Sequence, residues 1–95
     1  KWDVELQTPL GKQGFIADLT ADDSTVNGTT DSKQTGAAVL RDGAVHDDEF
    51  NFIVDLKKPF PMAMSFEFTI QGDQLTGIGR AKGLPKIKAK GTRIG

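Results

Sequence analysis

The 95-residue sequence contains no cysteine and a single histidine. The lack of cysteine excludes disulfide bonds, thiolate catalysis and cysteine-ligated metal sites. One histidine leaves any nitrogen-rich metal site short of ligands. The sequence therefore indicates no metal and no cofactor.

The chain also lacks an excess of one charge and a long apolar run. Twelve basic side chains stand against 13 acidic ones, which gives a net charge of −1 at pH 7. Because that balance provides no general field to hold a polyanion, nucleic acid is not an expected partner. No apolar run approaches the ~20 residues of a membrane-spanning helix, so no membrane span is expected.

The length fits one domain covering residues 1–95, because single domains of ~100–150 residues are typical. Leu, Ile, Val and Phe make up 24 of the 95 residues, which is enough for a folded core. The sequence begins at Lys1 rather than at methionine, as in a processed product, a shortened chain or a domain of a longer protein. Compartment and oligomeric state stay open.

Apolar and polar residues alternate along several segments, which is the pattern of half-buried strands. The clearest examples are residues 2–6, 50–56 and 62–70. Eleven glycines and four prolines are spread so widely that few windows could hold a long helix. The pattern predicts an all-β chain.

A short motif recurs along the chain: an apolar residue, a polar residue, then an apolar or small residue. Its copies begin 24, 24 and 25 positions apart, at Trp2, Val26, Phe50 and Leu75. The last three copies each follow an acidic turn, and a second turn lies between copies. The repeat predicts four hairpins of about 24 residues and hence eight strands. The alternative is a chance similarity between turns that are spaced evenly.

Eight antiparallel strands can form two sheets or close into an up-and-down barrel, and only closure removes exposed strand edges. Trp2 begins the first expected strand and Arg93 ends the last, and these strands are neighbours in a closed barrel. A guanidinium over the indole face would then seal that end, contributing ~0.5–2 kcal/mol. The alternative is an ordinary core tryptophan and a solvated arginine.

This pair makes the chain resemble the calycin superfamily of lipocalins, fatty-acid-binding proteins and avidins, where a tryptophan of strand one packs against an arginine of the last strand. Turns such as residues 71–77 and the terminal Gly91-Thr92-Arg93 also resemble those of small bacterial β-domains. The glycine that usually lies two residues before the lipocalin tryptophan would precede Lys1. The resemblance implies an eight-stranded barrel with a small interior cavity, because true lipocalins are longer.

Alternate turns of such a barrel lie at opposite ends and divide its charges. Turns are expected near Asp22, Asp48 and Gly72 at one end and near Lys12, Lys33, Pro59 and Gly83 at the other. The first end, here the acidic end, collects Asp22, Asp23, Asp47, Asp48 and Asp73. The second, here the lysine end, collects Lys12, Lys33, Lys57, Lys58, Lys82 and Lys86. These are solvated turn residues, or the lysines draw an anionic ligand into the barrel.

The lysine end is the candidate ligand-binding site, because apolar residues accompany its charges. Its expected lining is Phe60, Met62, Met64, Leu10 and Leu84, with Lys12, Lys58 and Lys82 as its charges. The acidic end has no equivalent apolar turn residues. The turn residues could instead cap the barrel or meet a partner chain, and the flexible methionines could simply fill the core.

The expected interior sets large residues against small ones. Phe50, Phe52, Phe66 and Phe68 form one wall, whereas Gly77, Gly79, Ala81, Ala89 and Gly91 add little volume on the last two strands. The result is either a packed core or a void for one small ligand, since eight-stranded barrels permit both.

Candidates for catalysis are few. His46 beside Asp47 and Asp48 is the one acid/base group near neutral pKa, but its position in a turn predicts exposure. Arg41-Asp42-Gly43 is interpreted as the lead-in to a turn. The catalytic residues, if any, are unknown.

The leading hypothesis is a small barrel that binds a small hydrophobic or amphipathic molecule, with an anionic group preferred at the lysine end. The alternative is a small barrel enzyme that isomerises or cyclises an enclosed hydrophobic substrate. A third possibility is a packed structural domain without a ligand.

Overall fold

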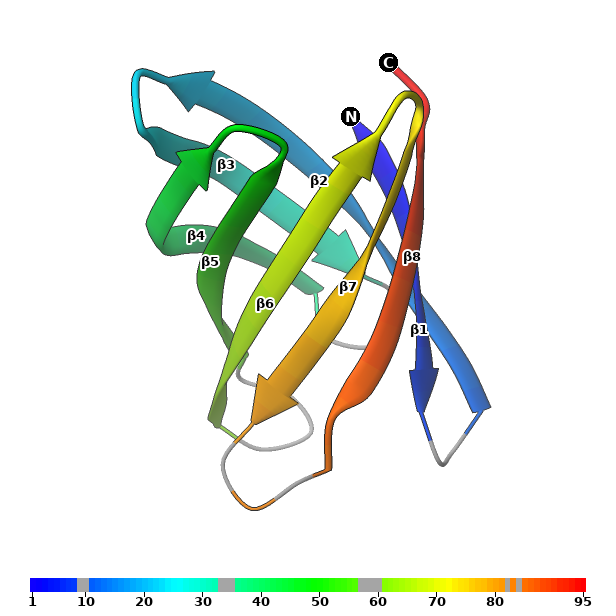
Figure 1. The fold of residues 1–95 in the computed structure, drawn as a ribbon. Coiled ribbons are helices and arrows are strands. Elements are labelled where there is room, and N and C mark those ends of the chain that lie inside the picture. Colours follow the sequence, from blue (N-terminus) through cyan, green and yellow to red (C-terminus); the bar gives the residue numbers. More distant parts are fainter. Residues whose placement is uncertain (9–10, 33–35, 57–60, 82, 84) are drawn as a thin grey trace.

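The computed structural model describes residues 1–8, 11–32, 36–56, 61–81, 83 and 85–95. Eight antiparallel strands follow one another around a closed barrel (Figure 1). They are β1 (Trp2–Thr8), β2 (Gly11–Asp22), β3 (Thr25–Ser32), β4 (Gly36–His46), β5 (Glu49–Leu56), β6 (Met62–Gln71), β7 (Gln74–Ala81) and β8 (Ile87–Arg93). The all-β, up-and-down barrel that the sequence predicts is confirmed.

The barrel closes between its first and last strands. β1 pairs antiparallel with β8, and in this register Trp2 lies opposite Arg93 and Val4 lies opposite Gly91. Every other strand pairs with its sequence neighbours. Because the sheet closes on itself, it presents no open edge for pairing with another chain.

Each repeat of the sequence forms one hairpin, and Trp2, Val26, Phe50 and Leu75 are buried at the first or second position of β1, β3, β5 and β7. The hairpins are joined by two-residue turns at the acidic end, at the top of Figure 1. The first turn residues, Asp23, Asp47 and Gly72, have left-handed φ values of 54°, 54° and 65°. Such values suit tight hairpin turns, in which Gly and Asp are common.

The four connections at the lysine end fall largely on residues 9–10, 33–35, 57–60, 82 and 84, which lie outside the described residues. The flanking strand ends lie together at that end, as the hairpin order requires.

One expected turn is wrong. Arg41, Asp42 and Gly43 lie inside β4, where they form a β-bulge. Arg41 is opposite Ile53 and Ala44 is opposite Asn51, so two residues, Asp42 and Gly43, face one residue of β5. Asp42 has a left-handed φ of 54°, and a Cβ at Gly43 would overlap the carbonyl oxygen of Val26. The chain bends here without reversing, as bulged strands do.

The middle of the barrel is filled by an aromatic cluster, which consists of Phe15, Phe50, Phe52, Phe66 and Phe68. Neighbouring ring centroids are 5.3–6.1 Å apart. The glycines of β7 lie opposite these rings: Gly77 pairs with Phe68 and Gly79 pairs with Phe66. A Cβ at either glycine would come within 2.8 Å of the facing ring. The small residues therefore make room for the rings, and the middle is packed.

We expect Gly77→Ala to lower the free energy of unfolding by about 1–3 kcal/mol, the usual cost of overpacking a core. The added Cβ would overlap the carbonyl oxygen of Glu67 and crowd Phe68. The control is Thr76→Ala, at the exposed neighbouring position of β7, for which strand propensity predicts a loss below ~1 kcal/mol. Denaturant unfolding measures both values, and equal losses would contradict the packing account.

Candidate functional site

Among the described residues, the aromatic cluster lies between two cavities, one near each end of the barrel. Phe15 and Phe66 line a cavity at the lysine end, whereas Phe50 lines one at the acidic end. The rings of Phe50, Phe52 and Phe66 lie in sequence between them, with centroids 6.1 and 5.5 Å apart. A ligand in one cavity is therefore separated from the other by packed rings.

The lysine-end cavity has a volume of about 60 Å³. One water molecule needs ~10–15 Å³ on this measure, so the space exceeds that of a single water. Its apolar walls come mainly from β1, β5 and β6 and include Leu6, Val54, Leu56, Met64 and Phe66. Gln13 of β2, which pairs with Leu6, and Thr30 and Ser32 of β3 add polar groups to the adjoining part of the wall. An apolar space with a few polar groups on one side is typical of small-molecule sites.

Three residues of the candidate site predicted from the sequence can be placed. Met64 lines the cavity and is buried, with an exposed fraction of 6%. Met62 is half-buried, lies opposite the lining residue Leu56 and packs against the core. Lys12 is exposed on β2, where its Nζ lies 3.4 Å from Glu5 Oε1.

The other five predicted residues of this site lie outside the described residues. They are Leu10, Lys58, Phe60, Lys82 and Leu84. Their roles at the lysine end stay predictions.

The polar wall was not predicted from the sequence, because its residues lie neither in turns nor among the apolar positions. Continuing the alternation of Phe15 and Ala17 back along β2 gives Gln13, and continuing that of Val26 along β3 gives Thr30 and Ser32. Thr30 is buried, and no buried side-chain nitrogen or oxygen among the described residues lacks a hydrogen-bond partner. These polar side chains could therefore have been predicted to face inward by extending the alternation of each strand to its end.

The acidic end contains the larger cavity, of about 150 Å³. Its lining is mostly apolar and comes from strand ends: Trp2, Leu19, Ala21, Val26, Val45, Phe50, Ile70 and Arg93. This end has no apolar turn residues of the kind predicted at the lysine end, and its apolar lining comes from strand residues instead. Both ends thus carry an apolar hollow lined by described residues.

Trp2 and Arg93 meet at the acidic end. The Cζ atom of Arg93 lies 4.6 Å from the centroid of the Trp2 ring, within the range of a cation–π interaction. The Nε of Arg93 lies 3.3 Å from Asp73 Oδ1, and its backbone N–H donates a hydrogen bond to the Asp73 carbonyl. These contacts join the end of β8 to β1 and to the β6–β7 turn.

His46, the acid/base candidate, is 89% exposed at the end of β4, and its Nε2 lies 3.4 Å from Asp47 Oδ2. It lines neither cavity. Within the described ranges, no group of three or more His, Asp or Glu side chains could hold a metal ion. The same ranges contain no helix long and apolar enough to cross a membrane.

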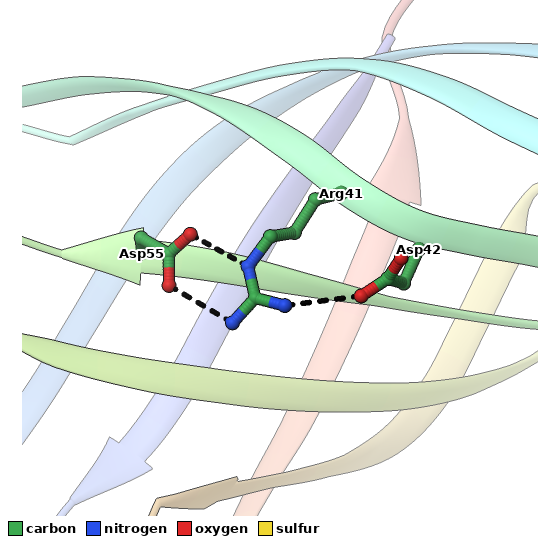
Figure 2. Close-up of polar contacts among 3 residues, drawn as sticks. All are labelled: Arg41, Asp42 and Asp55. Carbon is green, nitrogen blue, oxygen red and sulfur yellow. Dashed lines mark hydrogen bonds and ion pairs between the residues drawn. The ribbon is translucent and has the colours of Figure 1, made fainter.

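A charged cluster on the outer face joins the bulge to β5 (Figure 2). Arg41 donates hydrogen bonds from Nε to Asp55 Oδ2 at 2.6 Å and from Nη2 to Asp55 Oδ1 at 3.1 Å. Its Nη1 donates to Asp42 Oδ2 at 3.0 Å. The hydrogen bond from Arg41 lowers the pKa of the Asp55 carboxyl and raises the pKa of the guanidinium. Because these groups are exposed and paired with each other, the cluster fixes the two strands rather than forming a reactive site.

Comparisons with models of known families, with curated proteins and with solved structures gave no match to this chain. The closed eight-stranded barrel agrees with calycin-like architecture, but no family is identified. The function is therefore argued from the two cavities and their charges.

Truncation of the indole tests whether Trp2 and Arg93 seal the acidic end. We expect Trp2→Ala to cost ~3–5 kcal/mol of unfolding free energy, because it removes a buried aromatic side chain. Arg93→Ala should cost less, since the guanidinium is partly exposed. Unchanged denaturant midpoints in both variants would show that the contact has no sealing role, and Lys88→Ala on the outer face of β8 is the control.

The Arg41–Asp55 pair predicts a change in stability with pH. Since Arg41 lowers the pKa of Asp55 in the folded state, the pair stabilises the fold above the ordinary pKa of aspartate, ~3.9. That contribution is lost as pH falls through the lower, folded-state pKa. In Arg41→Gln, the carboxyl of Asp55 should titrate at a higher pH by NMR, whereas Lys88→Gln should not change it.

Proposed function

We propose that the barrel binds the apolar end of a small amphiphile in the lysine-end cavity. The observation that carries the proposal is an apolar hollow with three polar side chains on one wall. The aromatic cluster beneath it sets a depth limit. A short alkyl or similar group could therefore enter while its polar head stays at the mouth.

The lining suits such a group. Met64 is flexible and polarizable, so it can adapt to ligands of different shape. Leu56 and Gln13 are only half-buried, which leaves them able to move when a ligand enters. Each methylene removed from water contributes ~0.8 kcal/mol, so a short chain gains useful affinity from this lining.

Lysines at the mouth favour an anionic head. Lys86 is exposed at this end of the barrel, and so is Lys12, whose charge is partly offset by Glu5. The sequence of the connections adds Lys33, Lys57, Lys58 and Lys82. A unit charge ~7 Å from a carboxylate in water changes its affinity by on the order of threefold. A fatty-acid-like molecule is thus the ligand class we propose. No ionisable side chain is present among the described lining residues, so no observation favours the isomerase or cyclase alternative.

The test compares octanoate with octan-1-ol by methyl NMR. Met62 and Met64 are the two methionines of the chain, and both lie at the start of β6 at the lysine end. We expect saturable shifts of the Met64 methyl with both probes and tighter binding of octanoate. The preference should shrink as salt shortens the Debye length from ~10 Å at 0.1 M to ~3 Å at 1 M.

Matched variants locate the site. Gln13→Phe should fill the cavity and weaken both probes about tenfold, the effect of losing ~1.4 kcal/mol, whereas Gln7→Phe at an exposed position of β1 should not. Lys12→Glu should reduce the preference for octanoate, but Lys90→Glu, near the middle of β8, should leave it nearly unchanged. Phe60→Ala and Lys58→Glu, beyond the described residues, should also weaken octanoate binding. Unsaturable shifts, or equal effects from both members of a pair, would exclude the proposal.

A further inference from the structure

We infer that the acidic-end cavity is a second, separate binding site, and that it takes a cationic amphiphile such as an alkylammonium ion. The inference does not rest on the proposed function, because it concerns the opposite end of the barrel. Its basis is the combination of an apolar hollow with a rim of carboxylates.

The hollow is larger than that of the lysine end, about 150 Å³ against 60 Å³. Leu19, Val45 and Ile70 line it and are only partly buried, although each packs against the core. The chain thus leaves apolar side chains partly in water at a concave surface. An apolar group placed there would remove this surface from water, with an affinity gain of about fourfold per methylene.

At this end, exposed aspartates lie within two residues of lining residues of the hollow. Ala21 precedes Asp22 and Asp23, Val45 lies two residues before Asp47, and Phe50 lies two residues after Asp48. All of these aspartates are exposed. A ligand whose apolar end occupies the hollow would therefore place its head among acidic side chains, where a cation is favoured.

Arg93 is the one cation among the described lining residues. Its guanidinium already lies over Trp2 and beside Asp73. It therefore neutralises Asp73. The four carboxylates of the other two turns, Asp22, Asp23, Asp47 and Asp48, exceed the positive charges that Lys1 adds at this end. The same geometry makes an anionic head unfavourable, since it would meet those carboxylates.

The chain contains built-in reporters for the two ends. Trp2 is its single tryptophan and lines the acidic-end cavity, whereas Met64 lines the lysine-end cavity. Trp2 lies four residues along β1 from Leu6, a lysine-end lining residue; that separation is ~13 Å at ~3.3 Å per residue. Fluorescence of Trp2 and the methyl signal of Met64 therefore report different sites in one titration.

The experiment titrates the chain with octylammonium, octan-1-ol and octanoate at low salt, below micelle formation. We expect octylammonium to change the Trp2 fluorescence saturably and to bind at least about fivefold more tightly than the alcohol, since each unpaired carboxylate ~7 Å away contributes on the order of threefold. Octanoate should bind most weakly at this end. Added salt should reduce the differences.

Two variants and their controls test the lining and the rim. Val45→Phe should fill the hollow and weaken octylammonium about tenfold, while Val39→Phe, 73% exposed on the same strand, should change it less than about twofold. Because Val45→Phe could disturb folding, the surface double variant Asp22→Asn/Asp48→Asn provides a second test. It should reduce the preference for ammonium over alcohol severalfold, and Asp31→Asn on β3 should not.

The outcomes separate the two sites. If octylammonium moves the Met64 signal without changing Trp2, or if octanoate binds at Trp2 as tightly as octylammonium, the acidic-end site is excluded. That result would leave the lysine-end proposal standing. If octanoate does not shift the Met64 signal while octylammonium still changes the Trp2 fluorescence, only the lysine-end proposal is excluded.

Discussion

The pairing of β1 with β8 is the constraint on which the rest of the structure depends. It makes a sheet of eight strands into a tube of fixed width, and such a tube is barely wide enough for its own side chains. The large rings of β5 and β6 can be accommodated only because Gly77 and Gly79 lie opposite them. The closed barrel therefore requires the small residues of β7.

The packing of the rings inside the closed barrel determines where a ligand could bind. The aromatic cluster occupies the centre, and the two end cavities lined by described residues lie on either side of it. The turns at the acidic end carry exposed aspartates, whereas Lys12 and Lys86 are exposed at the other end. A small barrel can thus offer two unlike mouths without an enlarged core.

The sequence predicted the architecture because its signals are local and repeated. Alternation defined the strands, and the spacing of Trp2, Val26 and Phe50 defined the hairpins. The bulge at Asp42 was missed because aspartate and glycine are turn residues in most contexts, and only the pairing with β5 shows that the strand continues. The cavities were predicted only in part, because some of their lining residues are polar. Thr30, for example, is buried because of its register in β3, and no turn motif predicts that burial.

The two ends of the described chain lie beside each other at the acidic end. The Lys1 amino group donates a hydrogen bond to the Gly95 carbonyl at 2.6 Å, and the Ile94 N–H donates to the Lys1 carbonyl at 2.9 Å. The pairing of β1 with β8 is thus one of the eight strand pairs of the closed barrel. A circular permutant that links these ends and opens the chain at Gly72 would keep all eight strand pairs.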